Sequence, residues 1–544
     1  MKKPIAAAIG VISIAALVGC SSTDTATPPA TEQGDLLVIT PAATGELDSA
    51  SWNLPYGEPA SIDPIKAFNY PENTVVANLC EGLMQLQPDF SITPNLAESY
   101  SSPDASTYIY KIRQGVTFWD GTPMTMDDVV FSLSRSLNPK EGSYWAGSVT
   151  SNISSITQSG DWEVTFTLKA PDSTFNSFMI TPLGVVVEKK QREAADADYG
   201  TPSGGVMCTG PFSVGDWQQG QSITLERNDN YWNKEHVAKT KSLTINFIVE
   251  PAAITSAIST GAIDGSYDVP LGAIPQLKKA TNGKLYQGRS LQIVAVISTG
   301  EGAFGDPAVR KALMMATDRQ AIAATVYEGT AKASTSILPD NGWAYGNDIF
   351  TKARKALPGP EVDLAGAKEV LKGAKADLTQ PIKIAYPSER GHYADIISEI
   401  SNAATKLGLT VEPEGVPSAK FGAFFSDPEA RAGHDAFMTT NYMSVPDPLA
   451  FLRTIAAAGG SQNFSDYSND EISSLLKEAA AAVEENERAE KMAKVESLLM
   501  DDVPWLPIVD PSVQLFMNDR VTGVPASFVY LYYPWASDLG ASGK

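Results

Sequence analysis

Few side chains that could perform catalysis lie at the spacing that catalysis requires. Ser474 and Lys477 have the Ser-x-x-Lys spacing of acylating enzymes, but they lie in a stretch with helical periodicity and one apolar face. A solvent-exposed serine and lysine explain this pair without chemistry. Asp127-Asp128 and Asp501-Asp502 are adjacent acids, and adjacent residues of a helix do not face each other. We interpret them as charges at helix ends, and we expect no enzymatic activity.

Histidine and cysteine are too scarce for a metal centre built by the protein alone. The sequence contains three of each, which are His236, His392, His434, Cys20, Cys80 and Cys208. Zinc and haem-iron sites draw mainly on these residue types. We therefore expect no metal site and no cofactor.

The composition is that of a large globular protein with an acidic surface. The 544 residues are 43% hydrophobic and include 63 acidic and 41 basic side chains, a formal net charge of −22. At roughly 150 residues per domain, this length predicts several folding units. Nucleic-acid backbones are bound by clustered lysine and arginine, so the excess of acid argues against a nucleic-acid partner.

The first 35 residues predict export and attachment to a membrane. A basic start, Met1 to Pro4, precedes an apolar run, Ile5 to Val18, of the length typical of a secretory signal. The run ends in Leu17-Val18-Gly19-Cys20, which resembles the lipobox of bacterial lipoproteins, so we expect cleavage after residue 19 and a diacylglycerol on Cys20. Residues 20–35 are rich in Thr, Pro and acid and predict a disordered tether. We expect no membrane contact apart from this lipid anchor.

Export also bears on the two remaining cysteines. Cys80 and Cys208 are an even number of thiols in an oxidising compartment and could form a disulfide. Two buried thiols that act as small apolar groups are the alternative.

Strand and helix patterns alternate along the rest of the chain. Period-two runs predict strands at 107–113, 162–168, 223–226 and 243–249. Asp306-Pro307 predicts a helix start, and Asp318 predicts the cap of a second helix that ends at Gly329. Ser468 and Glu471 have the spacing of a capping box before an apolar face formed by Ile472, Leu475, Leu476, Ala479 and Val483. This alternation indicates α/β lobes with parallel sheets, whose ligands bind at the junctions between lobes.

A series of short segments resembles the family 5 extracellular solute-binding proteins, which serve oligopeptide, dipeptide and nickel ABC importers. The segments are Ser61 to Pro64, Glu81 to Leu83, Pro94 to Ser99, Trp119 to Pro123 with Asp128 and Val129, Thr209 to Phe212, Arg227 to Trp232, Phe304 to Ala312, Asp447-Pro448, Pro504 to Pro507, and Val521 with Gly523. Most have a local structural explanation. Asp120-Gly121 suits a turn, and Gly210 marks a position that excludes a Cβ.

The resemblance implies an α/β fold, a type II periplasmic-binding-protein-like two-lobed clamp with an extra α/β domain of the cluster C type. It places lobe I at about 36–70, 181–290 and 505–540, the extra domain at 71–180, and lobe II at 291–504. In such a clamp a solute binds between the lobes, which close around it, and the closed form is recognised by the permease.

The same resemblance implies where the solute binds. Phe68, Asn69 and Tyr70 correspond to a loop of lobe I, and Tyr144 and Trp145 to aromatic residues of the extra domain. Thr440, Asn441, Tyr442 and Ser444, with Asp447, correspond to the lobe II strand that pairs with a peptide backbone. For each aromatic residue, packing in the core is the alternative.

Ser444 departs from the family pattern, because many peptide-binding members carry an acidic residue there that binds the α-amino group of the ligand. A buried ammonium without a countercharge is costly. Either another carboxylate takes the role, with Glu58, Glu301 and Asp447 as candidates, or the solute has no free ammonium at that end. A peptide is the leading solute, and a modified peptide, a sugar or another organic solute is the alternative. Nickel would need a chelator, since histidine is scarce.

The resemblance therefore implies a lipid-anchored, monomeric solute receptor on the outer face of the cytoplasmic membrane, with ABC permease and ATPase subunits as partners. The alternative is a peptide-sensing or envelope lipoprotein with the same clamp.

Overall fold

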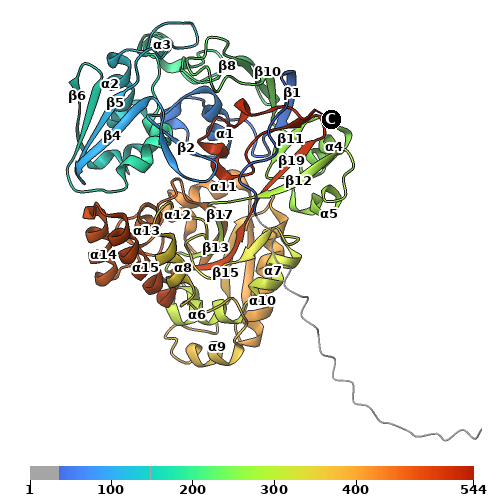
Figure 1. Cartoon of the computed structure of the whole chain (residues 1–544). Helices are drawn as coiled ribbons and strands as arrows, with labels where there is room; N and C mark the ends of the chain where they lie inside the picture. The colour runs from blue at the N-terminus through green and yellow to red at the C-terminus, as the bar shows by residue number, and fades with distance from the viewer. Residues whose placement is uncertain (1–35, 148, 544) are drawn as a thin grey trace, which may run out of the picture.

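Three larger β-sheets organise the computed structural model, which describes residues 36–147 and 149–543. Figure 1 shows two bodies, one above the other, with the extra domain beside the upper one. The expected signal peptide, the lipid-bearing Cys20 and the tether fall outside the described residues. Within the described part, none of the helices has the length and apolar character needed to cross a membrane.

Lobe I is built on a seven-stranded sheet with the order β12-β19-β11-β1-β10-β9-β8. Its strands are β1 (Leu47–Asn53), β8 (Phe212–Gln218), β9 (Ser222–Arg227), β10 (Thr240–Asn246), β11 (Gly265–Tyr267), β12 (Gly283–Gly288) and β19 (Val513–Asn518). Strand β1 lies parallel to β10 and β11, and the other pairings are antiparallel. The helices α4 (Pro251–Thr260) and α5 (Ile274–Leu277) pack their isoleucine and leucine side chains against Phe516 of β19.

Lobe II is built on a six-stranded sheet with the order β14-β18-β13-β17-β15-β16. Its strands are β13 (Gln292–Ser298), β14 (Ala331–Ala333), β15 (Ile382–Pro387), β16 (Val411–Val416), β17 (Ala436–Tyr442) and β18 (Trp505–Pro511). Every residue of β13 is buried, as expected for a central strand covered on both faces. Around the sheet lie α6 (Pro307–Ala316), α7 (Arg319–Thr325), α8 (Asn347–Arg354), α9 (Leu364–Leu371), α10 (Gly391–Lys406), α11 (Ser418–Phe421), α12 (Pro428–Arg431), α13 (Pro448–Ala456), α14 (Asp470–Ala481) and α15 (Glu485–Asp502).

The extra domain is built on a four-stranded antiparallel sheet with the order β4-β5-β7-β6. Its elements are β4 (Ala97–Asp104), β5 (Thr107–Ile112), β6 (Ile153–Gly160), β7 (Glu163–Leu168) and α2 (Met126–Ser134), against which α3 (Lys189–Ala195) packs. Alternate residues of β5 and β7 are buried, which is the period that the sequence predicts. The short strands β2 (Met84–Leu86), β3 (Ile92–Pro94), β20 (Val521–Thr522) and β21 (Gly540–Ala541) form two further ribbons.

Two of the expected boundaries, which are approximate, shift by fewer than ten residues. Strand β18 begins at Trp505 but pairs with β13 in lobe II, so the chain returns to lobe I at Ser512 and not at 505. The helix α1 (Tyr70–Leu79) packs against β8 and the short helix η12 (Phe528–Leu531), so it belongs to lobe I and the extra domain begins after it. In both cases the apolar segment completes the core of the preceding body before the chain crosses.

The expectation of parallel sheets is wrong, since both large sheets are mixed.

Several predicted helix ends shift as well. Asp306 caps α6 as predicted, whereas α7, capped by Asp318, ends at Thr325 and not at Gly329. Asn469, not Ser468, caps α14, because its side chain reaches the amide of Ile472.

One further helix and one strand end earlier than the sequence predicts. The last residue of the predicted apolar face, Val483, lies beyond the end of α14 and is 57% exposed. Strand β10 ends at Asn246, before Val249. Ser474 is exposed on α14 and its hydroxyl donates to Glu478, which agrees with its interpretation as a surface residue.

Candidate functional site

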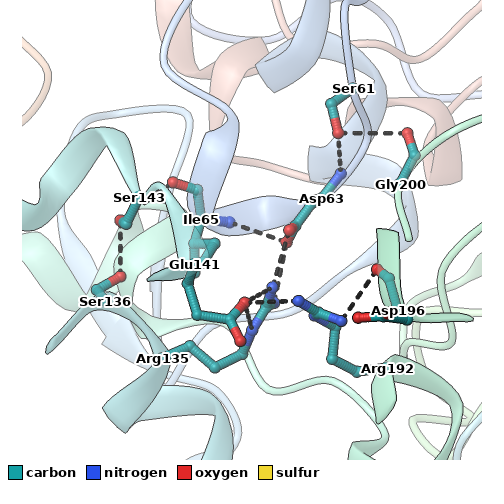
Figure 2. A network of polar contacts seen from close by, with 10 residues as sticks. All are labelled: Ser61, Asp63, Ile65, Arg135, Ser136, Glu141, Ser143, Arg192, Asp196 and Gly200. Carbon is teal, nitrogen blue, oxygen red and sulfur yellow. Dashed lines mark hydrogen bonds and ion pairs between the residues drawn. The ribbon is translucent and has the colours of Figure 1, made fainter. Parts of the chain in front are cut away.

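A buried network of ion pairs joins lobe I to the extra domain (Figure 2). The guanidinium of Arg135 donates to both carboxylate oxygens of Asp63, at 2.9 and 2.8 Å. Glu141 accepts from Arg135 at 2.8 Å and from Arg192 at 2.9 Å. Burial acts to lower the pKa of Arg135, but its hydrogen bonds to Asp63 and Glu141 outweigh burial and raise it. Paired in this way, the buried charges fix the two chain segments that carry them.

The network positions two exposed aromatic rings. The hydroxyl of Ser143 donates to the carbonyl oxygen of Ile65 at 3.2 Å, and the indole N–H of Trp145 donates to the carbonyl oxygen of Ala67 at 3.3 Å. These bonds hold the segment that bears Tyr144 against the segment that bears Phe68. The two rings stack with centroids 4.3 Å apart and planes 15° apart, and they are 57% and 43% exposed.

Aromatic side chains also contact one another across the two lobes. We call Tyr56, Tyr70, Tyr442, Phe528 and Tyr530 the interlobe aromatic set. Tyr70 stacks on Tyr56 at 4.3 Å and meets Tyr442 of lobe II edge-on at 5.2 Å. Tyr442 also packs against Phe528 at 5.3 Å. The lobes therefore contact each other through uncharged aromatic rings. Opening the lobes would separate these rings without leaving a buried charge unpaired.

Two hydrogen bonds accompany these ring contacts. Tyr442 donates its hydroxyl to the carbonyl oxygen of Phe68 at 2.8 Å. Gln292, at the start of β13, donates its amide to the hydroxyl of Tyr70 at 2.7 Å.

Two opposite charges flank this aromatic set. Arg390, just before α10 of lobe II, places its guanidinium 5.2 Å from the ring centroid of Tyr56. Its side chain is exposed and forms no ion pair with any carboxylate of residues 36–147 and 149–543. Asp268, which follows β11 of lobe I, accepts hydrogen bonds from the hydroxyls of Tyr56, at 3.1 Å, and Tyr530. Burial raises the pKa of Asp268.

The charge of Arg390 also acts on a neighbour in α10. Burial, and then the positive charge of Arg390, lower the pKa of His392 to about 4. His392 is therefore neutral at physiological pH, so the positive charge next to Tyr56 comes from Arg390.

The predicted lobe II segment lies at the same interface, but its amides are already bonded. Thr440 donates its backbone N–H to the hydroxyl of Tyr393 at 2.8 Å. Tyr442 donates its backbone N–H to the side-chain oxygen of Asn441 at 2.7 Å. The side-chain NH2 of Asn441 in turn donates to the side-chain oxygen of Gln462. A ligand backbone that paired here would have to displace these side chains.

Three of the predicted residues serve the fold. Asn69 caps α1 by accepting from the amide of Tyr70. Trp145 is buried and braces the Ala67 carbonyl oxygen. Asp447 is 1% exposed and caps α13, accepting from the amides of Leu449 and Ala450 and from the hydroxyl of Tyr345. Its cap role takes up Oδ1 of the carboxylate, and a contact between Asp447 and the solute stays a prediction.

The other two proposed replacements for the acid missing at Ser444 also lie elsewhere. Glu58 accepts from the indole of Trp217 and the amide of Gly220, in the hairpin between β8 and β9. Glu301 follows the end of β13 that is opposite to Gln292 and accepts from the amide of Gly433. Ser444 itself is partly buried next to Tyr532. Burial raises the pKa of the Tyr532 phenol, and the nearby Ser444 hydroxyl acts to lower it.

Sequence reasoning missed Tyr56, Asp268, Gln292, Arg390 and Tyr530. Each lies in or next to a loop with no motif of its own. For Asp268 the one local signal is an acidic residue in a short loop directly after a strand and before Pro270. Nothing in the spacing brings residues from five distant segments together.

The family-like motifs meet at a scaffold junction. Glu81 accepts from the hydroxyl of Thr209 at 2.7 Å, the hydroxyl of Tyr231 at 2.8 Å and the indole of Trp232 at 2.8 Å. A Cβ at Gly210 would lie 2.4 Å from the carbonyl oxygen of Leu79, which explains the glycine.

Next to this junction, Cys80 and Cys208 form a disulfide with a Cα–Cα distance of 5.0 Å. Cys80 follows α1, where the chain leaves lobe I, and Cys208 precedes β8, where it returns. The disulfide therefore closes the loop that contains the extra domain.

Comparison with known proteins agrees with this arrangement. Residues 91–463 match the family model for bacterial extracellular solute-binding proteins, family 5 (middle region), which is more than half of the chain. The chain belongs to this family. A relative, the dipeptide-binding protein DppE of Bacillus subtilis, is 26% identical over 501 residues, with 88% of this chain and 90% of DppE covered. As a family 5 member, the protein binds a solute and is not an enzyme.

Solved structures share the two-lobed clamp. The periplasmic binding protein DppA from Helicobacter pylori, in complex with the peptide STSA, superposes with a TM-score of 0.78 at 22% identity, covering 92% of this chain and 99% of that one. NikA from Staphylococcus aureus, in complex with Ni(L-His)2, gives a TM-score of 0.73 at 21% identity, covering 89% and 98%. At these identities the likeness shows the fold. Because the bound molecules differ, the clamp alone does not name the solute.

Proposed function

We propose that this protein is the solute receptor of an ABC importer, and that the solute binds between the lobes in contact with the interlobe aromatic set. The observation that carries the proposal is the exposed, unpaired guanidinium of Arg390 facing Tyr56 of the other lobe. A receptor must hold its solute by groups from both lobes if binding is to favour closure. Rings from lobe I, the extra domain and lobe II meet at this place.

We assign to Arg390 a carboxylate of the solute. A guanidinium presents several N–H donors in a plane and binds carboxylates through two parallel bonds. Here Tyr56 stacks beneath it and no carboxylate of the described chain neutralises it. The faces of Phe68 and Tyr144 are exposed next to the interface and suit apolar side chains of a solute. These features, and the dipeptide named for the relative DppE, support a short peptide as the solute.

Mass spectrometry of the purified protein under native conditions tests the proposal. We expect the folded chain to retain one small solute that carries a carboxylate, and Arg390→Met to release it, while the solute-free forms of both proteins unfold at the same midpoint. Lys241→Met, which removes an exposed cation that pairs with Asp48 within lobe I, is the control. Retention of the same solute by the Arg390→Met variant would contradict the assigned site.

We further propose that Cys20 carries the lipid that keeps the receptor on the outer face of the cytoplasmic membrane, next to its permease. The lipobox-like residues before Cys20 support this. Cys20→Ala should accumulate as an unprocessed precursor without diacylglycerol, and deletion of the gene should abolish uptake of the solute found by mass spectrometry. Normal lipidation of the variant, or unchanged uptake, would refute the respective part.

A further inference from the structure

The position that binds the ammonium group in many peptide-binding relatives is a serine in this chain, Ser444. None of the three sequence candidates replaces it, since Asp447 caps α13 and Glu58 and Glu301 are bonded elsewhere. One carboxylate, that of Asp268, is nevertheless hydrogen-bonded to the interlobe aromatic set, through Tyr56. We propose that Asp268, supplied by the opposite lobe, binds the ammonium group of the solute. This inference rests on the proposed function.

The hydrogen bonds of Asp268 leave one of its oxygens available. Both tyrosine hydroxyls, of Tyr56 and Tyr530, donate to Oδ2. Oδ1 accepts no hydrogen bond from the described residues, and the side chain is only partly buried. A carboxylate has room for about four hydrogen bonds, so Oδ1 can accept a further charged donor while Oδ2 keeps both tyrosines.

The backbone holds this carboxylate in place. Asp268 has a φ of +49°, in the left-handed region that a residue other than glycine seldom adopts. Its N–H donates to the carbonyl oxygen of Gln514 in β19 at 2.7 Å, which anchors the turn to the lobe I sheet. The side chain is therefore fixed by both its own hydrogen bonds and the sheet, and a fixed acceptor loses little entropy when it binds a ligand.

Asp268 and Arg390 lie on two sides of one tyrosine. The hydroxyl of Tyr56 donates to Asp268, and its ring lies beneath the guanidinium of Arg390. The acid comes from lobe I and the base from lobe II, and the two are too far apart to form an ion pair. A solute that carries both an ammonium and a carboxylate would satisfy both charges and connect the lobes. The chemical class is thus a zwitterion with a free amino group, such as an unblocked peptide or amino-acid derivative.

A purely structural role is the competing explanation: Asp268 would then only hold the two tyrosines together, and loss of its charge would affect all solutes alike.

Asp268→Asn separates the two explanations. Asparagine tolerates the left-handed backbone and still accepts the tyrosine hydroxyls through its side-chain oxygen, but it has no charge. Glu58→Gln is the matched control, because it removes one negative charge from lobe I at a carboxylate that is bonded to Trp217 and Gly220 and not to the aromatic set. The probes are an equimolar mixture of lysine-free tripeptides and tetrapeptides, and the same mixture after N-acetylation, each titrated by calorimetry into solute-free protein.

We expect the wild type and Glu58→Gln to bind the free-amino mixture at least ten-fold more tightly than the acetylated one. Asp268→Asn should lose about ten- to a hundred-fold in affinity for the free-amino mixture and bind both mixtures equally. If Asp268→Asn keeps the wild-type preference, or weakens both mixtures by the same factor, the inference is overturned while the proposed function stands.

The remaining outcomes concern the wild type. Equal binding of both mixtures by the wild type also overturns the inference. If the wild type binds neither mixture, the peptide part of the proposed function fails and the inference fails with it. Equal unfolding midpoints of the three proteins show that a change in affinity is not a loss of the fold.

Discussion

The junction between lobe I and the extra domain differs in kind from the contact between lobes I and II. The first is closed by the Cys80–Cys208 disulfide and by the buried pair of Asp63 and Arg135. The second consists of rings and of single hydrogen bonds such as the one from Tyr442 to Phe68. Buried charges lose several kcal/mol when they are parted, whereas rings lose contact area in small steps. The difference indicates which half of the clamp is rigid and which half moves.

The extra domain touches lobe II as well, through one ion pair and a few hydrogen bonds. Arg453 donates to Asp172 at 2.9 Å, and the Ser173 amide donates to the carbonyl oxygen of Ala480 at 2.9 Å. Asp172 is 3% exposed but the Arg453 side chain is 30% exposed, so the pair is half-buried, and among the described residues no disulfide or second ion pair reinforces it. Lobe I and the extra domain therefore form one body, and lobe II can move against both.

Removal of the disulfide should have the largest effect on stability. The bond closes a loop of 128 residues, and in the chain-entropy model a loop of this size contributes about 4–5 kcal/mol to the free energy of unfolding. We expect the Cys80→Ser/Cys208→Ser variant to lose about this amount in urea unfolding monitored without reductant. Wild type treated with reductant is the control and should match the variant. A loss below about 1 kcal/mol would show that the junction does not depend on the disulfide.

Arg135→Met should destabilise the same junction by about 3–5 kcal/mol, because it leaves the carboxylate of Asp63 buried without its partner. Solute affinity should fall too, since the network holds the segment that carries Tyr144. The double variant Asp63→Leu/Arg135→Met removes both charges and should recover most of the stability. If the single variant unfolds at the wild-type urea concentration, the ion pair is not what joins the two domains.

Asp510 lies in β18, the strand after which the chain crosses back to lobe I. Burial, and then the charge of Asp340, raise the pKa of Asp510 to about 7 from its ordinary value of 3.8. Between these values the folded state binds more protons than the unfolded state, so the free energy of unfolding should fall as the pH rises from 4 to 7. We expect Asp510→Asn to reduce this fall by on the order of 1–3 kcal/mol.

Urea unfolding at several pH values between 4 and 8 measures the effect of Asp510. Other buried carboxyls, including Glu81 and Asp447, have raised pKa values and act in the same direction. The difference between variant and wild type isolates Asp510. Parallel pH profiles for the two proteins would contradict its raised pKa.

Tyr442→Phe should have the smallest effect, and it should appear in binding alone. The variant loses one hydrogen bond between the lobes, which corresponds to about 0.5–1.5 kcal/mol, or a two- to ten-fold weaker solute affinity. Tyr110→Phe is the matched control, because its hydroxyl donates to Asn176 on the extra-domain side and should affect stability only. Calorimetry and urea unfolding of both variants provide the measurement. Weaker binding in Tyr110→Phe but not in Tyr442→Phe would reverse the assignment of rigid and moving halves.

Much of the fold could be predicted from the sequence, because its signals are local. The period-two burial of β5 and β7 and the Asp306 cap of α6 depend on residues a few positions apart. Segment ends were less predictable. Ser468 and Asn469 are both good caps, and only the path of the chain into the helix decides which side chain reaches the Ile472 amide.

The candidate site was predicted in part. Phe68, Tyr70, Tyr144 and Tyr442 do lie together where the three bodies meet. For Asp447, the same Asp-Pro pair that marks the motif also starts a helix, and the local hydrogen bonds engage its carboxylate. Asn69 likewise caps a helix, so for both residues a contact with the solute stays a prediction.

The sequence by itself determined the family, the order of strands and helices, and the absence of an acid at position 444. Only the tertiary structure decided that the carboxylate of Asp268, which we propose as its replacement, lies next to Tyr56. Asp268 follows β11 of one sheet and Arg390 follows β15 of the other, and both reach Tyr56 because the two sheets, each built of strands from distant parts of the chain, lie in different lobes that face each other. Spacing acts over a few residues along a helix or strand, whereas the packing of sheets joins residues such as Phe68 and Tyr442, which are 374 positions apart.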